Sequence, residues 1–181
     1  MKKTVFLSGS RKLSRLNDLI RGRLDKMMDQ GLHIIVGDAN GADKALQSYL
    51  AEARYENVVV FCAGDRCRNN VGEWPVENVI VSQKLKGRDF YAEKDKAMAS
   101  KADFGFVLWD GKSTGSIGNV LELMNSGKKV AVYFSSEKKF HDLKQASDVE
   151  NLLQLCESSD YRAMNDKIHV RRRLDDLRSA Q

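Results

Sequence analysis

Three short segments of the sequence combine glycine with hydroxyl or charged side chains, which are residue types that bind phosphate groups. The first segment is Ser8-Gly9-Ser10-Arg11. Its glycine allows close backbone approach, and its arginine can make two parallel hydrogen bonds to a phosphate. The alternative is structural, with Ser10 capping a helix and Arg11 exposed to solvent. The candidate ligand-binding residues here are Gly9, Ser10 and Arg11.

The second segment is Gly37-Asp38-Ala39-Asn40-Gly41-Ala42-Asp43. It matches neither the dinucleotide-binding fingerprint nor a Walker A loop. Gly37 and Gly41 still permit a tight turn from a strand into a helix. Asp43 would either complement the dipole of that helix or accept a hydrogen bond, from a ribose hydroxyl or from the first segment. Both interpretations stay open, and Gly37, Gly41 and Asp43 are candidate ligand-binding residues.

The third segment places two glycines, three hydroxyl side chains and a lysine before a predicted helix. This composition favours a phosphate site at a helix N-terminus. The alternative is a glycine turn in which Thr114 caps the helix. Because the segment directly follows an apolar strand that ends at Trp109, we favour ligand binding. Its candidate residues are Asp110, Gly111, Lys112, Ser113, Thr114, Gly115 and Ser116.

A charged pair occupies the apolar face of the helix that precedes this third segment. At about 100° per residue, Tyr91, Met98 and Ala102 share one face with Lys94 and Asp95. Charges on a buried face are costly unless they are paired or used. Lys94 and Asp95 therefore form either a structural salt bridge or a polar pair that points into a ligand site at the sheet edge.

Alternating strands and helices position all these residues. Apolar strands are predicted at residues 4–9, 32–37, 57–62, 104–110 and 128–134, with amphipathic helices between them. Uninterrupted Val/Ile/Phe runs indicate strands that are covered on both faces. The predicted fold is α/β, a doubly wound, Rossmann-like and mostly parallel sheet with helices on both faces. Ligands bind such sheets beyond the carboxyl ends of the strands, where the three segments lie.

The remaining regions are less regular. Residues 62–77 are predicted to form a loop, followed by a short strand at residues 78–82. Helical patterns recur weakly near residues 149–156 and 161–178. We predict a Rossmann-like domain at residues 1–136 and a C-terminal helical extension at residues 137–181. The extension would pack on the domain or form a dimer interface.

The composition sets limits on the function. The net charge of +5 is compatible with nucleic acid, although small anionic ligands fit equally well. No apolar run is long enough to span a membrane, and a cytoplasmic location is predicted. The cysteines Cys62, Cys67 and Cys156 are too few and odd in number for a disulfide framework, and no histidine completes a zinc site near them. We predict reduced cysteines, no metal and no cofactor. Arg171, Arg172 and Arg173 are predicted to lie in a solvated tail or on a solvated helix face.

In combination, these segments resemble the SLOG superfamily. That group includes the Rossmann domain of DNA-processing protein A and the LOG-type phosphoribohydrolases, and the likeness is greatest to the small YspA-like branch. The matching features are the Gly-Ser-Arg segment after the first strand, the GxxxGAD turn at residues 37–43, the Lys94-Asp95-Lys96 helix and the glycine-threonine loop at residues 111–116. The resemblance covers residues 3–134.

The resemblance implies a nucleotide-related ligand and a homodimer. It implies that Arg11, Lys94 and the loop at residues 111–116 contact phosphate, and that Asp43 and Asp95 meet ribose or base. LOG-type enzymes have an arginine in place of Lys94 and a catalytic glutamate in PGGxGTxxE. Residues 115–119, GSIGN, have no carboxylate there. Glu122 lies a turn further on and is predicted to point away from the core.

Three functions are therefore kept from the sequence. The first is the binding of a nucleotide or nucleotide derivative, in the manner of a sensor. The second is hydrolysis of an N-glycosidic bond in a nucleotide, for which the candidate catalytic carboxylates are Asp95, Asp43 and Glu122. The third is nucleic-acid binding, which we disfavour because aromatic and basic residues are not interleaved.

Overall fold

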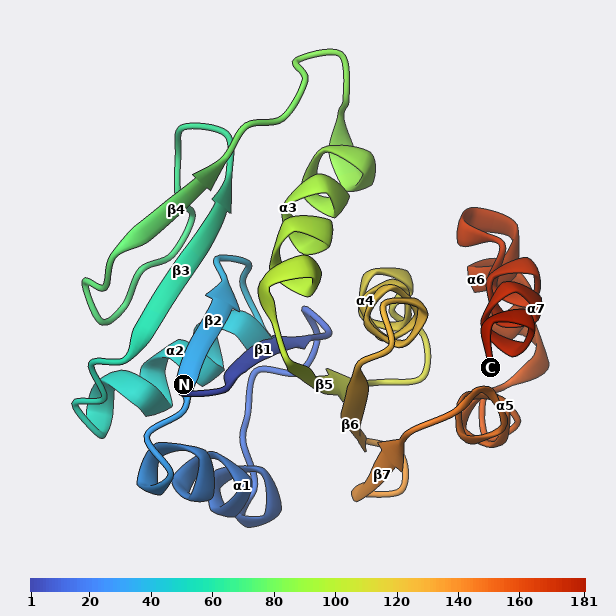
Figure 1. The fold of residues 1–181 in the computed structure, drawn as a ribbon, viewed down its shortest axis with the longest axis horizontal. Coiled ribbons are helices and arrows are strands. Elements are labelled where there is room, and N and C mark those ends of the chain that lie inside the picture. Colours follow the sequence, from blue (N-terminus) through green and yellow to red (C-terminus); the bar gives the residue numbers. More distant parts are fainter.

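A single seven-stranded sheet forms the centre of the computed structural model, which describes residues 1–181 (Figure 1). The strand order across the sheet is β4-β3-β2-β1-β5-β6-β7. The elements in chain order are β1 (Thr4–Gly9), α1 (Asp18–Asp29), β2 (His33–Gly37), α2 (Ala42–Glu52), β3 (Val58–Ala63), β4 (Val76–Val79), α3 (Gly87–Lys101), β5 (Phe104–Trp109), α4 (Thr114–Asn125), β6 (Lys129–Phe134), β7 (Lys139–Leu143), α5 (Ala146–Leu153), α6 (Ser158–Ile168) and α7 (Val170–Ala180).

The sheet is parallel except for β7, which pairs antiparallel with β6. The chain builds outward from β1 through β2 to β4 on one side, and through β5 to β7 on the other. The predicted Rossmann-like α/β fold is thus confirmed. The strand order reverses between β1 and β5, the position at which open α/β sheets leave a crevice for ligands.

Helices cover both faces of this sheet, because successive strand residues point to opposite sides. Val5 and Leu7 of β1 pack into the core beneath α1 and α2, whereas Phe6 packs into the core beneath α3 and α4. The second core continues into α5, α6 and α7. No helix in the structure combines the length and the apolar character needed to cross a bilayer.

Two elements begin at other residues than predicted. The three- and four-residue spacing of Leu13, Leu16 and Ile20 predicts a first helix that includes Leu13 and Leu16. Instead, α1 begins at Asp18, because the Asn17 side chain accepts a hydrogen bond from the Ile20 backbone nitrogen and caps the helix there. Leu13 and Leu16 instead pack from the preceding loop against the core. The outermost strand β4 begins at Val76 rather than at residue 78.

The C-terminal region departs from its helical prediction. Residues 139–143 form β7, which extends the sheet by one strand. The helix predicted at residues 161–178 is two helices, α6 and α7, separated by His169 with φ of 55°. The helix α7 packs on α4, next to the edge of the sheet that carries the third segment. The domain division at residue 136 stays a prediction.

Two predictions about individual residues are wrong. Cys62 and Cys67 are not reduced but form a disulfide, because the turn after β3 brings their Cα atoms to 5.2 Å from each other. The spacing of the two cysteines in the sequence does not indicate this turn. Tyr91 was placed on the buried face of α3, yet it is 36% exposed because it lies near the end of the helix that projects beyond the core. Met98 and Ala102 are buried as predicted.

Candidate ligand-binding cleft

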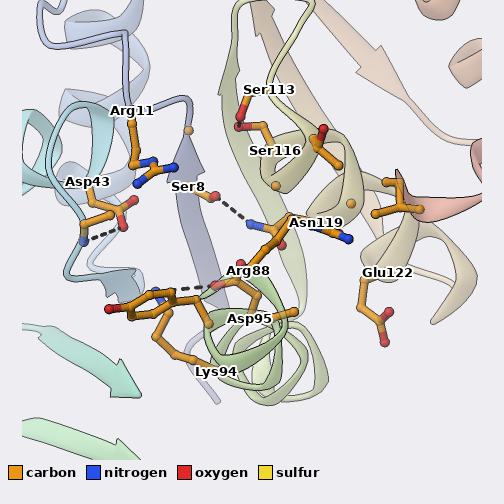
Figure 2. A pocket seen from close by; sticks show the side chains of 18 of the residues that line it. Ser8, Arg11, Asp43, Arg88, Lys94, Asp95, Ser113, Ser116, Asn119 and Glu122 are labelled. Carbon is orange, nitrogen blue, oxygen red and sulfur yellow. Dashed lines mark hydrogen bonds and ion pairs between the residues drawn. The ribbon is translucent and has the colours of Figure 1, made fainter. Parts of the chain in front are cut away.

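A cleft of about 1010 Å³ opens at the carboxyl ends of β1, β2 and β5 (Figure 2). It lies between the N-terminal ends of α2 and α4 and one side of α3. Nine of the residues that line it are lysine or arginine, and four are aspartate or glutamate. The cleft therefore favours an anionic ligand.

All three predicted segments meet at this cleft. The predicted residues that line it are Gly9, Arg11, Asp43, Lys94, Asp95, Asp110, Lys112, Ser113, Thr114, Gly115, Ser116 and Glu122. The other four, Ser10, Gly37, Gly41 and Gly111, lie behind its surface and shape the backbone. At Gly41, with φ of 81°, an added Cβ would lie 2.0 Å from the Arg11 carbonyl oxygen, so this glycine lets the first two loops touch.

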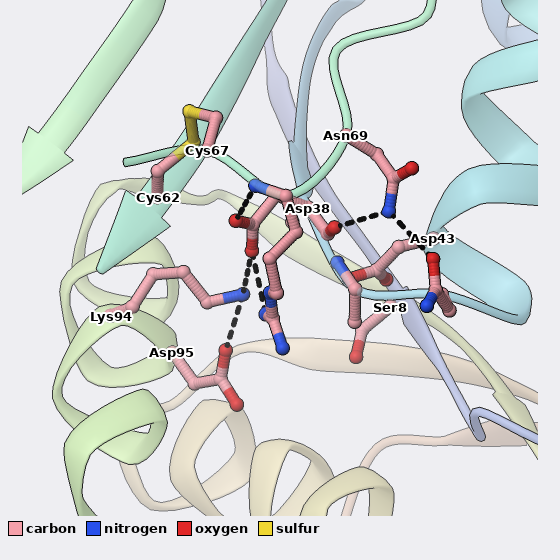
Figure 3. Close-up of polar contacts among 12 residues, drawn as sticks. Ser8, Asp38, Asp43, Cys62, Cys67, Asn69, Lys94 and Asp95 are labelled. Atoms are coloured by element: carbon pink, nitrogen blue, oxygen red, sulfur yellow. Dashed lines mark hydrogen bonds and ion pairs between the residues drawn. A yellow bond between two sulfur atoms is a disulfide. The ribbon is translucent and has the colours of Figure 1, made fainter. Parts of the chain in front are cut away.

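One wall of the cleft is a set of five charged residues, here named the charge cluster: Asp38, Asp43, Arg68, Lys94 and Asp95 (Figure 3). The Lys94 ammonium lies 3.4 Å from an Asp95 carboxylate oxygen and 3.7 Å from an Asp38 oxygen. Arg68 donates to both carboxylate oxygens of Asp38, from its backbone nitrogen at 2.9 Å and from its guanidinium at 2.7 Å.

The pKa values follow from this arrangement. Burial acts to lower the pKa of Lys94, but the carboxylates of Asp95, Asp43 and Asp38 outweigh it and raise that pKa. Burial acts to raise the pKa of Asp38, and the hydrogen bonds from Arg68 with the charge of Lys94 lower it below the usual value. Asp43 is the exception, because burial outweighs the attraction of Lys94 and raises its pKa to about 6.

Gly37 allows the charge cluster to form. A Cβ at this position would lie 2.5 Å from an Asp43 carboxylate oxygen and 2.6 Å from the Lys94 nitrogen. The two charged groups therefore rest directly on the end of β2. Lys94 is only 4% exposed and faces inward as the helical period predicts, whereas the Asp95 side chain is partly exposed in the cleft. The Lys94 ammonium is engaged by carboxylates of the protein itself.

The opposite wall carries the hydroxyl groups of Ser113, Thr114 and Ser116, with Ser10 directly behind them, and these four residues are here named the hydroxyl cluster. Asp110 and Lys112 line the same side of the cleft. The Ser116 hydroxyl lies 3.3 Å from that of Ser10 and donates to that of Ser113 at 3.2 Å. The Asp110 carboxylate accepts from the backbone nitrogens of Lys112 and Ser113, which holds the loop in its turn before α4.

The first turn of α4 presents free donors to the cleft. The first hydrogen bond of this turn runs from the Ile117 nitrogen to the Ser113 carbonyl. The backbone N–H groups of Thr114, Gly115 and Ser116 have no acceptor in the protein, and no acidic residue lies in this turn. An anion placed there would accept these hydrogen bonds and meet the positive end of the helix dipole.

Arg11 and Lys12 reach the cleft from the loop after β1 and form no ion pair. Between the two walls, the Asn119 side-chain amide donates to the Ser8 hydroxyl at 2.8 Å (Figure 2). The side-chain carbonyl oxygen of Asn119 accepts no hydrogen bond from the protein. These groups are available to a ligand without breaking an existing contact.

Glu122 lies at the far end of the cleft and is not simply solvated. Its carboxylate lies 3.3 Å from the guanidinium of Arg173, which reaches it from α7. Burial lowers the pKa of Arg173 more than Glu122 raises it. Of the arginine run, Arg171 and Arg172 are exposed as predicted, whereas Arg173 is partly buried in this contact.

Several cleft residues could not be found by reading the sequence. Asp38 lies inside the second segment but carried no distinguishing pattern, and Arg68 lies in the irregular loop after β3. Arg88, Lys167 and Arg173 reach the cleft from α3 and the C-terminal helices. Asp38, Cys62 and Cys67 offer ligand atoms within 4.8 Å of one another, but both sulfurs are bonded and Asp38 is paired with Arg68, so they form no cation site in this state.

Comparison with known proteins shows the fold alone. No protein-family model matches the sequence, and no curated protein matches it. Among solved structures, the chain is similar to DNA processing protein A from Helicobacter pylori, which was described for a unique single-stranded DNA binding mode. The TM-score is 0.56 at 12% sequence identity, over 92% of this chain and 80% of that one.

Proposed function

We propose that the cleft binds a nucleotide or nucleotide derivative, with a phosphate group at the N-terminus of α4. The free N–H groups of Thr114, Gly115 and Ser116 carry this proposal, because they face a basic cleft and have no acceptor in the protein. Arg11 and Lys12 supply positive charge that the protein leaves unpaired. The sequence resemblance to the SLOG superfamily, YspA-like branch, supports a nucleotide as the anion, and a homodimer and a cytoplasmic location stay predictions.

The two walls suggest an orientation for the ligand. A phosphate at the hydroxyl cluster leaves the sugar over the Ser8–Asn119 pair, whose free acceptor and hydroxyl suit ribose hydroxyl groups. Asp43 and Asp95 lie beyond this pair on the charge cluster. The Asp43 carboxyl, with a pKa of about 6, can accept or donate a hydrogen bond near neutral pH.

Titration calorimetry with adenosine monophosphate and inorganic phosphate tests the proposal. The Arg11→Ala variant should bind both probes about 10-fold more weakly, because a hydrogen bond to a charged group is lost. Its stability should not change, since Arg11 is exposed and forms no ion pair. Arg15→Ala is the matched control, because Arg15 is exposed in the same loop but does not line the cleft. Equal affinity in wild type and Arg11→Ala would refute the proposed phosphate position.

Hydrolysis of an N-glycosidic bond is a second candidate, favoured by the raised pKa of Asp43. A protonated Asp43 could donate to the leaving base while the Asp95 carboxylate stabilises positive charge on the sugar. Against this, Asn119 stands where the LOG-type motif has its glutamate, and Glu122 is paired with Arg173. Chromatography of nucleoside monophosphates after incubation with the protein tests it, and the absence of free base would exclude those substrates.

Nucleic-acid binding is the third candidate, and the likeness to DNA processing protein A is its support. Single-stranded DNA sites usually stack bases on aromatic side chains. Tyr91 is the one aromatic residue that lines this cleft, and the Arg68 guanidinium covers its ring at 4.0 Å. A gel shift with oligothymidine at about 200 mM salt would separate specific binding from weak electrostatic contact.

A further inference from the structure

The disulfide between Cys62 and Cys67 lies directly behind the charge cluster (Figure 3). Cys62 is buried near the end of β3, and Cys67 is partly exposed in the loop that follows. Both sulfurs and an Asp38 carboxylate oxygen lie within 4.8 Å of one another. The disulfide therefore lies next to the buried Asp38 carboxylate, which pairs with Lys94 and Arg68.

The bridge anchors the segment that forms part of the cleft wall. Arg68 follows Cys67 directly, makes two hydrogen bonds to Asp38 and stacks on Tyr91. The Asn69 side-chain amide donates to the Asp38 carbonyl at 2.8 Å and to the Asn40 side chain at 2.9 Å. The position of Arg68 in the cleft is therefore set by the bridge on one side and by these hydrogen bonds on the other.

The restraint is local. The two cysteines are five residues apart, and closing so short a ring restricts the unfolded chain less than closing a long one. Asp65 and Arg66, within the ring, are exposed and add few packing contacts. Opening the ring should therefore alter the order of this loop far more than it alters the stability of the whole fold.

We propose that Cys62 and Cys67 are a thiol–disulfide exchange site, and that their redox state sets the affinity of the cleft for its anionic ligand. The exchange site stands on the geometry of the two cysteines and Arg68. The effect on affinity rests on the proposed function.

The exchange begins at Cys67, because Cys67 is partly exposed whereas Cys62 is fully buried. A thiolate of a small dithiol, or of a thioredoxin-type protein, attacks the Cys67 sulfur. The neighbouring Arg66 is exposed and forms no ion pair, so its positive charge favours the approach of the thiolate. A mixed disulfide forms with Cys67, the Cys62–Cys67 bond breaks, and Cys62 leaves as a thiolate that takes a proton from solvent. The second thiolate of the dithiol then displaces Cys67, which gives the oxidised dithiol and a second cysteine thiol. Two electrons pass from the dithiol to the protein.

Reduction changes the cleft through Arg68. Two thiol sulfurs repel at the distance of a bonded pair, so they must move apart. Cys62 is fixed in β3, which pairs with strands on both sides, and the Cys67 loop is the part that can move. Arg68 is then displaced from Asp38, and the cleft loses a positioned cation.

The test uses the Cys156→Ala protein, so that Cys62 and Cys67 are the remaining cysteines. Alkylation under denaturing conditions should label no cysteine before dithiothreitol treatment and two cysteines after it. Hydrogen–deuterium exchange should then quicken on reduction at residues 64–70 and stay unchanged in α1, the internal control. The affinity for adenosine monophosphate should fall about 5- to 10-fold on reduction. The Cys62→Ser/Cys67→Ser variant should behave like the reduced protein with and without dithiothreitol.

The outcomes separate the two proposals. Slower hydrogen–deuterium exchange at residues 64–70 in the oxidised state supports the thiol–disulfide exchange site even if no nucleotide binds in either state. In that case the proposed function alone fails. Two alkylated cysteines before reduction, or identical hydrogen–deuterium exchange in the oxidised and reduced protein, would overturn the redox proposal. Nucleotide binding of equal affinity in both states would overturn the link between the bridge and the cleft.

Discussion

The two walls of the cleft bring polar groups to the same sheet edge, but they use them differently. In the charge cluster, each ammonium or guanidinium group meets a carboxylate of the protein, and Lys94 and Asp38 are almost fully buried. In the hydroxyl cluster, no side chain is charged, yet three backbone N–H groups have no acceptor. The charges of the charge cluster are therefore already compensated within the protein, whereas the hydroxyl cluster and the first turn of α4 keep donors free for an anion.

This difference changes how Lys94 is understood. A lysine on the inner face of a helix next to a cleft suggests a ligand contact, but its ammonium is already placed between Asp95 and Asp38. Removing one partner of a buried charge set leaves the others without compensation. We infer that Lys94 primarily stabilises the cleft wall, and that Arg11 and the N-terminus of α4 are the better positioned groups for a phosphate.

The largest expected effect comes from Lys94→Met. The variant leaves three neighbouring carboxylates with Arg68 as their single cation, and it should lower the free energy of unfolding by about 3–5 kcal/mol. Urea denaturation measures this loss. Lys96→Met, on the exposed side of the same helix, is the matched control and should change stability by less than about 0.5 kcal/mol. Similar small losses in both variants would contradict a structural role for Lys94.

The next effect is a pH dependence from Asp43. Its pKa is raised to about 6 in the folded protein from 3.8, so the folded state binds a proton that the unfolded state releases in this range. The free energy of unfolding should therefore fall as the pH rises from about 4 to about 6, by about 3 kcal/mol at 1.36 kcal/mol per pKa unit.

The Asp43→Asn variant isolates this dependence. Asparagine can still accept the hydrogen bond from the Ala39 nitrogen, but it does not titrate, so the fall between pH 4 and 6 should disappear. Asp38 acts in a lower pH range, because its pKa is lower in the folded protein than in the unfolded protein. Its ionised carboxylate adds stability above the unfolded-state pKa, and this stability is lost as the pH falls through the folded-state pKa. Urea midpoints across this pH range give the measurement, and an unchanged slope in Asp43→Asn would assign the titration to another group.

A smaller effect concerns Gly37. The Cβ that Gly37→Ala adds would push against the Asp43 carboxylate and the Lys94 ammonium, and the variant should cost about 1–3 kcal/mol as an overpacked site.

Gly22→Ala is the opposite case, because Gly22 lies in the interior of α1 with open space around it. That variant should be more stable than wild type by about 0.5–1 kcal/mol, from the higher helix propensity of alanine. Thermal melts of both variants test the contrast, and a neutral Gly37→Ala would mean that the cluster tolerates displacement.

Part of this site could be predicted from local pattern. The apolar strand runs indicated a parallel sheet, and the carboxyl ends of parallel strands meet at one edge, which brought the three segments together. The helical period also placed Lys94 and Asp95 on the inner face of α3. Both features follow from residue spacing within a single element and from the order of the elements along the chain.

The partners of each charge could not be predicted in this way. Lys94 meets Asp38 across 56 residues of sequence, and Arg68 enters from a loop with no periodic pattern. The disulfide depends on a turn that brings Cys62 and Cys67 together, and β7 depends on an antiparallel return of the chain beside β6. Helix α7 supplies Arg173 to the cleft from the region with the weakest pattern.

The sequence by itself determined which kinds of residue stand at the strand ends, because hydrophobic periodicity acts within each element and the parallel topology follows from it. Only the tertiary structure decided which of those residues are already satisfied. An ion pair depends on distances of a few ångströms between segments that are remote in sequence, and no local pattern encodes them. For this reason Lys94 and the N-terminus of α4 look alike as anion sites in the sequence, but in the fold one is neutralised and the other is open.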